Sequence, residues 1–294
     1  MSTVSSTGAG LVASAEIRLM RLKARVKRWV HGVGRPQSPW LATCDAQLTF
    51  LVGERHVPML RHTLASLRRH EPQLPRLIIA ADTQLAAQRI AALDIGNTPD
   101  VRLCLWNTAF ELLPLEIKHF VERYVSHPRW SGFGKKLALI ASLNTTEDTL
   151  YCDTDMLWYA PALEDILRLL HSSYSRICIG TDYQQSYDKD LLSHLAFTFS
   201  SSVALNTGFL ALGRGVLVDA LGHARMANWS SYRGPFGCHT EQTLIACAAD
   251  CVGAQQIPQS IVGISMIDAG RFRRHFTPRV RHYVGPKTLY WRDC

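Results

Sequence analysis

The sequence predicts an α/β fold in which a mixed, mostly parallel sheet is flanked by helices. Short apolar runs alternate along the chain with segments whose apolar residues have helical spacing. Strands that alternate with helices usually form right-handed crossovers between parallel strands. The chain has 294 residues, of which 47% are apolar and 19% charged, so it can bury a substantial core. This composition excludes collagen-like, coiled-coil and disordered chains.

Strands are expected where a short apolar run is bounded by polar or turn residues, in residues 47–52, 76–82, 101–106, 149–157, 176–182 and 204–212. Helical spacing predicts helices in residues 57–70 and 83–93, which separate the first three strands. Another helix begins near Trp130, and the proline-led segment 161–173 is a further one. The chain contains no internal repeat.

Polar side chains occur at the ends of several predicted strands. Asp82 ends the second strand, Asp153 and Asp155 lie near the end of the fourth, and Asp182 ends the fifth. Asn206 belongs to the sixth. Ligands of open α/β sheets bind beyond the carboxyl ends of the strands. These residues are therefore the first candidates for function.

The D-x-D segment places the carboxylates of Asp153 and Asp155 two positions apart in apolar surroundings. Side chains at i and i+2 of a strand share one side, so both acids can face one point. Their mutual repulsion favours a bound cation, and a hard divalent ion is the simplest one. Taken alone, such a pair is more often a strand end whose acids cap a following turn or helix.

Four other motifs accompany this pair, and they favour the metal interpretation. They are a helix start that carries Lys135-Lys136, then Leu205-Asn206-Thr207-Gly208-Phe209, Thr240-Glu241-Gln242-Thr243-Leu244, and Arg281-His282-Tyr283-Val284-Gly285-Pro286-Lys287. In this order, residues from about 130 to 290 resemble the metal-dependent glycosyltransferases of the GT-A fold. They resemble in particular the retaining family of glycogenin and the bacterial lipopolysaccharide galactosyltransferases, glycosyltransferase family 8.

The resemblance implies a GT-A fold and a hexosyltransferase. It implies that a hexosyl group passes from a nucleotide-diphosphate sugar to an acceptor with retention of the anomeric configuration. It also implies that Asp153, Asp155 and His282 bind Mn²⁺ or Mg²⁺, which in turn holds the donor diphosphate. A mixed carboxylate and imidazole set suits manganese better than calcium.

The family pattern also assigns residues that contact the nucleotide sugar. Lys287 is placed to meet the diphosphate, and Gly285 lets the backbone approach it closely. Lys136, the better aligned of the two lysines, corresponds to a basic residue that touches the donor. Asp82 ends an early strand and could contact the nucleoside. UDP-sugar is the commonest donor of the family, but the usual base-binding Asp and Tyr are missing from residues 51–56, so the base stays open.

Asn206 and the pair Glu241-Gln242 correspond to residues that hold hydroxyl groups of the donor sugar. The usual Asp-Gln of the family is Glu-Gln here. Because the Glu241 side chain is one methylene longer than aspartate, the sequence does not determine which hydroxyl its carboxylate contacts or which sugar the site prefers. Asp182 could contact the sugar or the acceptor, or serve only as a turn residue. Gln242 could line the reaction face, but an amide is a weak nucleophile. The sequence identifies no general base.

The basic excess of +8 is concentrated at the two ends of the chain. Residues 1–40 and 271–294 each carry +6, whereas residues 41–270 carry −4, which excludes a nucleic-acid-binding body. Residues 1–40 are predicted as a basic amphipathic helix and linker, and residues 41–294 as the GT-A domain. Residues 15–30 could lie on an anionic membrane or pack on the domain.

We expect a cytoplasmic protein, peripheral at the inner membrane if residues 15–30 bind lipid. No run of eighteen apolar residues predicts a membrane span, and no pattern predicts a cleaved secretory signal. Eight scattered cysteines without a C-x-x-C pair predict reduced thiols and no zinc site. The acceptor could be a saccharide, a lipid-linked sugar or a protein.

Two alternatives to a glycosyltransferase remain open. One is a catalytically silent protein of the same fold or a membrane-surface adaptor. The other is a sugar nucleotidyltransferase, although residues 53–59 make a poor version of its Gly-rich loop. In the loop of residues 228–239, Trp229, Tyr232 and Phe236 could form an acceptor wall or a mobile lid, or pack beneath the loop.

Overall fold

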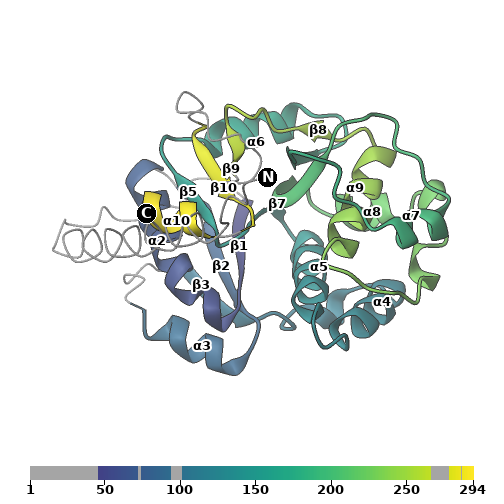
Figure 1. The fold of residues 1–294 in the computed structure, drawn as a ribbon, viewed down its shortest axis with the longest axis horizontal. Coiled ribbons are helices and arrows are strands. Elements are labelled where there is room, and N and C mark those ends of the chain that lie inside the picture. The colour runs from purple at the N-terminus through teal and green to yellow at the C-terminus, as the bar shows by residue number, and fades with distance from the viewer. Residues whose placement is uncertain (1–45, 72–73, 94–100, 266–277, 286) are drawn as a thin grey trace, which may run out of the picture.

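The computed structural model describes residues 46–71, 74–93, 101–265, 278–285 and 287–294 (Figure 1). Within these residues, seven strands form a central sheet in the order β3-β2-β1-β4-β7-β6-β8. Their bounds in chain order are β1 Ala46–Val52, β2 Arg76–Ala81, β3 Val101–Leu105, β4 Asp148–Cys152, β6 Ile177–Thr181, β7 Leu205–Leu212 and β8 Gln255–Gln256.

The central sheet is mixed and mostly parallel, as predicted. β1 pairs in parallel with β2 and β4, β2 with β3, and β6 with β8. Only β7, among the described strands of this sheet, runs antiparallel to its neighbours β4 and β6. The start of β7 therefore lies at the edge where β4 and β6 end. Asn206 pairs with Gly180 in this register and reaches the same edge as Asp153.

A second sheet, which the apolar runs did not predict, joins distant parts of the chain. It has the order β5-β10-β9 within the described residues: β5 Met156–Trp158, β10 Val280–Tyr283 and β9 Val262–Ser265. β10 runs antiparallel to β5 and parallel to β9. Because β5 follows β4 after only three residues, this small sheet starts at the carboxyl edge of the large one.

Helices cover both faces of the central sheet (Figure 1). Their bounds are α2 Val57–His70, α3 Gln84–Ala91, α4 Leu115–Val125, α5 Ser131–Asn144, α6 Leu163–Ser172, α7 Lys189–Leu195, α8 Val216–Leu221, α9 Thr240–Cys251 and α10 Thr288–Asp293. Short 3₁₀ turns lie at η1 Glu54–His56, η2 Phe110–Leu112, η3 Ala224–Met226 and η4 Trp229–Ser231.

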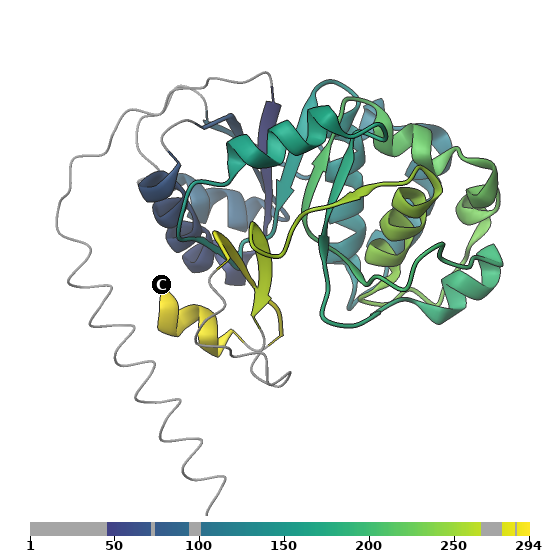
Figure 2. The same ribbon diagram turned by 90° about the horizontal axis from the view of Figure 1, so that it is seen from above.

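The two faces of the sheet bury separate sets of apolar side chains. On one face, Leu48, Phe50 and Leu150 pack with α2, α3 and α6. On the other face, Tyr151 and Leu210 pack with α4, α5, α8 and α9. The alternation of Leu150 and Tyr151 between these two cores is the period of two that a buried strand requires. In Figure 2, α2 and α10 lie at one end of the molecule and α8 and α9 at the other.

Polar side chains fix where several helices begin. The hydroxyl of Thr83 accepts from the N–H of Ala86 at the start of α3. The cap of α6 comes from a distant residue: Oε1 of Glu71, which follows α2, accepts from the N–H groups of Ala162 and Leu163 at 2.6 and 3.0 Å. Glu71 is buried, so it ties the end of α2 to the beginning of α6.

Several sequence predictions fall on residues that the structure does not describe. These are the amphipathic helix and linker of residues 1–40, the membrane contact of residues 15–30 and the domain boundary at residue 41. In the described part of the chain, no helix combines the length and hydrophobicity needed to cross a bilayer. No disulfide bond joins the cysteines in that part.

Candidate active site

The two aspartates of the D-x-D segment lie in a turn between the two sheets. The single strand expected over residues 149–157 is wrong, because β4 ends directly before Asp153 and β5 begins directly after Asp155 in the other sheet. The N–H of Asp153 donates to the carbonyl of Gly208 at 2.8 Å, and the carbonyl of Asp155 accepts from the N–H of Tyr283 at 3.0 Å. The carboxylates therefore converge through a turn that is tied to both sheets.

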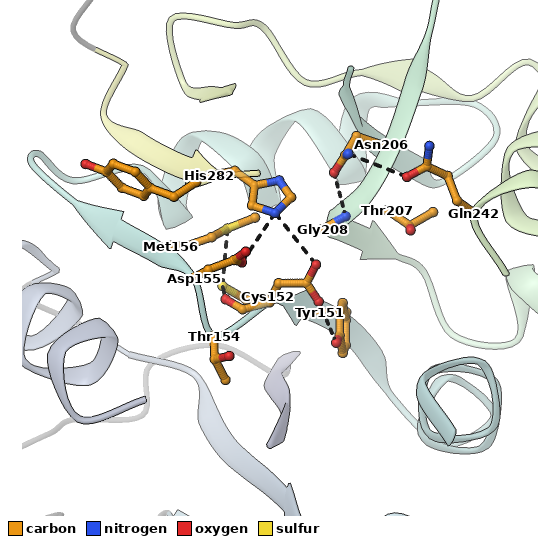
Figure 3. Close-up of polar contacts among 12 residues, drawn as sticks. Tyr151, Cys152, Thr154, Asp155, Met156, Asn206, Thr207, Gly208, Gln242 and His282 are labelled. Carbon is orange, nitrogen blue, oxygen red and sulfur yellow. Dashed lines mark hydrogen bonds and ion pairs between the residues drawn. The ribbon is translucent and has the colours of Figure 1, made fainter. Parts of the chain in front are cut away.

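His282 on β10 completes a cluster with these carboxylates (Figure 3). Its Nε2 lies 3.7 Å from Oδ2 of Asp153 and 3.3 Å from Oδ1 of Asp155. One ligand atom from each residue lies within 4.8 Å of the other two. A Cβ at Gly208 would lie 2.1 Å from Cε1 of His282, so a glycine is required for the imidazole to occupy this place.

The donor set fits a divalent ion such as Mn²⁺ or Mg²⁺. Oδ1 of Asp155 is buried and receives no hydrogen bond from any described residue, although His282 Nε2 is nearby. Burial alone would raise the pKa of Asp155, but His282 and Lys287 outweigh it and lower the pKa below its usual range. The Asp153 side chain is 30% exposed, which leaves the cluster open on one side. Two carboxylates and one imidazole thus face a common point.

Tyr151 and Lys136 orient Asp153. The Tyr151 hydroxyl donates to Oδ1 of Asp153 at 2.8 Å, and Lys136 Nζ lies 3.4 Å from the same oxygen. Burial, followed by the effect of Asp153, raises the pKa of Tyr151 well above its usual value, so the phenol keeps the proton that it donates. The other oxygen, Oδ2, is left to face His282.

Lys136 is enclosed with Glu241 on the central-sheet side of the cluster. Its Nζ lies 3.3 Å from Oγ1 of Thr207 and 3.7 Å from Oε2 of Glu241, and the Thr207 hydroxyl donates to that carboxylate at 3.2 Å. Burial would lower the pKa of Lys136, but Asp153 and Glu241 outweigh it and raise the pKa. Burial raises the pKa of Glu241 to about 7 against the opposing effect of Lys136. The Glu241 side chain is only 1% exposed.

Asp182, Asn206 and Gln242 form a second polar cluster beside the first. Asn206 Nδ2 donates to Oδ2 of Asp182 at 3.1 Å. It also donates to Oε1 of Gln242 at 3.5 Å (Figure 3). Oδ1 of Asn206 accepts from the N–H of Gly208 at 2.8 Å, which places this cluster next to the metal ligands. Gln242 also donates to the carbonyl of Ser186 at 3.2 Å. The three side chains are therefore preorganised by one another.

Asp82 lies apart from both clusters, at the end of β2. β1 separates β2 from β4, so Asp82 is not beside Asp153. Its backbone carbonyl accepts from Nζ of Lys135 at 2.9 Å, and its Oδ1 is buried without a hydrogen bond from any described residue. The adjacent lysines thus serve different places: Lys135 reaches Asp82, whereas Lys136 reaches Asp153.

Lys287 and Gly285 follow β10. Nζ of Lys287 contacts Oδ2 of Asp155 and donates to the carbonyl of Tyr283 at 2.7 Å. Gly285 has a φ of 75°, in the left-handed region that glycine adopts without strain. The sharp change in chain direction at Gly285 allows Lys287 to fold back onto the D-x-D turn.

The aromatic residues of the loop before α9 do not form an exposed wall. Trp229, Tyr232 and Phe236 are all buried, and the ring of Phe236 stacks on Tyr124 with centroids 4.8 Å apart. Phe120 of α4 packs edge to face against Phe236. Of the alternatives that the sequence left open, the structure supports packing beneath the loop.

The sequence prediction missed the residues that support the D-x-D turn. Tyr151 had a signal, because it precedes Asp153 by two positions and lies in β4, the strand that leads into the D-x-D turn. Thr63 of α2 had none: its hydroxyl donates to the carbonyl of Thr154 at 2.7 Å, across a large distance in sequence. Tyr290 of α10 lies 3.1 Å from the Thr63 hydroxyl and donates to the carbonyl of Met59.

Neither a protein-family model nor a curated protein sequence matches the chain. Solved structures do match it. Mouse xyloside xylosyltransferase 1, in its apo form, has a TM-score of 0.57 at 13% identity, over 82% of this chain and 98% of that protein. The bifunctional glycosyltransferase WbbM has a TM-score of 0.55 at 10% identity, over 88% of this chain and 50% of that protein.

The galactosyltransferase LgtC, in complex with donor and acceptor sugar analogs, is also similar. Its TM-score is 0.50 at 15% identity, over 82% of this chain and 87% of that protein. All three proteins are glycosyltransferases. These likenesses confirm the predicted GT-A fold.

Proposed function

We propose that this chain is a metal-dependent glycosyltransferase that transfers a hexosyl group from a nucleotide-diphosphate sugar to an acceptor with retention of configuration. The observation that carries the proposal is the convergence of Asp153, Asp155 and His282 at the carboxyl edge of a GT-A sheet. Such an edge is where α/β sheets bind their ligands. The unbonded buried oxygen of Asp155 supports a cation at this point.

Asp153, Asp155 and His282 would hold Mn²⁺ or Mg²⁺. When bound, the ion supplies electrostatic stabilisation for the negative charge that grows on the leaving diphosphate. Lys136 and Lys287 bring two further positive charges to the same region. Gly285 gives the chain the turn that carries Lys287 there. These residues prepare the site for an anion before the donor arrives.

The cluster of Asp182, Asn206 and Gln242 would bind hydroxyl groups of the donor sugar and face the acceptor. Hydrogen bonds among these three side chains already hold their polar atoms in place, so the side chains need little reorganisation when a sugar binds. Glu241 is enclosed behind Lys136, so in this proposal it acts on the sugar through the lysine. Asp82 would face the nucleoside. The proposed donor is a UDP-sugar, and the proposed acceptor is a saccharide, a lipid-linked sugar or a protein.

The first test combines ligand binding with product analysis. The full chain is heated with MnCl₂ and each of a panel of nucleoside diphosphates, and the nucleotide that raises Tm identifies the base. Nucleotide sugars with that base are then incubated with the protein, and released or transferred sugar is followed by mass spectrometry and anomeric NMR. We expect manganese-dependent transfer or hydrolysis with retention, abolished by EDTA.

Asp155→Asn should lower this activity on the order of 10²-fold or more, because metal stabilisation contributes several kcal/mol. Asp190→Asn changes an exposed carboxylate on α7 and is the matched control. Full activity of Asp155→Asn, or full activity of the native chain in EDTA, would contradict the metal assignment. Donor binding without turnover of any acceptor or water would support the catalytically silent alternative instead.

A further inference from the structure

Lys287 contacts one carboxylate oxygen of Asp155, a candidate metal ligand. Its ammonium contacts Oδ2 of Asp155, and it also donates to the carbonyl of Tyr283 at 2.7 Å. The other Asp155 oxygen, Oδ1, faces His282. A protein cation therefore contacts the carboxylate that would bind the metal.

The second lysine of the site is held in a different way. The Lys136 side chain is 7% exposed and has Thr207, Asp153 and Glu241 around its ammonium. The Lys287 side chain is 32% exposed, and among the described residues its ammonium contacts only Asp155 and Tyr283. Lys136 is thus enclosed, whereas Lys287 is partly exposed and has fewer partners that hold its ammonium in place.

Lysine ammonium groups face both aspartates of the site. Lys136 pairs with Asp153 and also with Glu241, and Lys287 pairs with Asp155. A divalent ion placed at these carboxylates would lie close to both ammonium groups and be repelled by them. Like charges at such distances in a partly buried site interact strongly. The ion pair of Lys287 therefore competes with metal binding.

We infer that Lys287 is an internal counter-ion that leaves Asp155 for the donor diphosphate, so that metal and nucleotide bind cooperatively. This inference rests on the proposed function, because it takes Asp153, Asp155 and His282 as the metal ligands. The diphosphate is a new anionic partner for Lys287 when the ion binds Asp155. Linkage requires the effect to be reciprocal: the diphosphate strengthens metal binding by the same factor as the metal strengthens diphosphate binding.

The inference predicts opposite effects of one substitution on two affinities. Lys287→Met removes the competing charge, so the variant should bind Mn²⁺ alone about tenfold more tightly, a change of about 1.4 kcal/mol. The same variant should lose most of the gain in Mn²⁺ affinity that uridine diphosphate gives the native chain. A residue that merely stabilised the fold would weaken both affinities or neither.

The measurement is the electron paramagnetic resonance signal of free Mn²⁺, titrated with the full chain with and without uridine diphosphate. Lys287→Gln is a second neutral variant, should the methionine variant fold poorly, and Lys287→Arg keeps the charge and should behave as the native chain does. Lys118→Met is the matched control, because Lys118 pairs with the carboxylate of Glu111 at 3.0 Å on another part of the molecule.

The outcomes separate the inference from the proposed function. If the native chain and Asp155→Asn both fail to bind Mn²⁺ with any nucleoside diphosphate, the metal site is wrong and the inference falls with it. If Asp155→Asn alone loses Mn²⁺ but neutral variants of Lys287 bind the ion no more tightly than the native chain, only the inference is overturned. Tighter binding by those variants, with an unchanged Lys118→Met, supports it.

Discussion

At the scale of single residues, the metal ligands depend on groups that would not themselves touch the ion. Tyr151 directs one oxygen of Asp153 toward the core side of the site and leaves the other to face His282. Residues that hydrogen-bond to metal ligands fix the ligand orientation and contribute to metal affinity. The candidate site therefore extends beyond the three ligands that sequence motifs identify.

Tyr151→Phe removes this orienting hydrogen bond while it keeps the aromatic ring. We expect the affinity for Mn²⁺ to fall about tenfold, since the loss of such a partner commonly costs ten- to a hundredfold. Mn²⁺ titration in the presence of a nucleoside diphosphate measures the change. Tyr232→Phe, which removes a hydroxyl that donates to the carbonyl of Pro235, should leave the affinity unchanged. Equal affinities in both variants would contradict the orienting role.

Glu241 gives a prediction about pH. Burial raises the pKa of Glu241 in the folded chain to about 7, above its usual value of 4.5, so the folded chain binds this proton more tightly than the unfolded chain does. The stability from this proton is present in full below pH 4.5 and is lost as the pH rises through about 7. In EDTA, the free energy of unfolding of the native chain should therefore fall, relative to that of Glu241→Gln, as the pH rises from 4.5 to about 7. Urea unfolding at several pH values measures this; parallel pH curves for the two proteins would contradict it.

At the scale of elements, sequence patterns predicted the strands of the central sheet but not how the site is assembled. Apolar runs locate β1 and β2, which fill buried positions in the sheet, and also β3, which is a partly exposed edge strand. The run around the D-x-D segment continues without a break, so its periodicity does not reveal that β4 and β5 belong to different sheets. The pairing of β5 with β10 depends on a contact between distant residues, which local pattern does not encode.

The ligand set was predictable for a different reason. Asp153, Asp155 and His282 stand in motifs that resemble a known family, and the structure brings them together. Thr63 and Tyr290 support the same turn through hydrogen bonds between α2, α10 and the turn. No local spacing in the sequence marks these two residues. Sequence motifs therefore do not reveal side chains that act through tertiary contacts.

The distant cap of α6 can be tested at this scale. Glu71→Ala removes the carboxylate that accepts from the first N–H groups of α6, and leaves them without that partner in a buried place. We expect a loss of about 1–3 kcal/mol in the free energy of unfolding. Urea denaturation measures the loss. Glu164→Ala, at an exposed position on the same helix, should cost less than about 0.5 kcal/mol; similar losses would argue against the cap.

At the scale of the whole molecule, charge is separated along the chain. Residues 1–40 and 271–294 are strongly basic, whereas residues 41–270 are slightly acidic. In the last segment, Arg279 and Arg281 are paired with Asp165 and Asp293, so part of this charge is neutralised locally. The basic N-terminal segment lies outside the described residues, and the sequence predicts either contact with an anionic membrane surface or packing on the domain for it.

Reversal of three charges in that segment tests the membrane proposal on the full chain. Replacing Arg21, Lys23 and Arg25 by Glu should weaken binding to phosphatidylglycerol vesicles on the order of 10²-fold, since each basic residue contributes about 1 kcal/mol. Co-sedimentation at low and high salt measures the binding, which should be salt-sensitive. The same reversal at Arg61, Lys189 and Arg214, all exposed on the domain, is the control. Equal binding of both triple variants would contradict the proposal.

The turn that joins the two sheets also has a consequence for how the protein is made. Asp155 and Lys287 are 132 positions apart, and β10 supplies His282 from the same late stretch. A ribosome will have released most of the large sheet before it synthesises the last ligand. A nascent or prematurely terminated polypeptide can therefore form much of the scaffold while it still lacks a complete cation site, and in the proposed mechanism only the finished product could act on a donor.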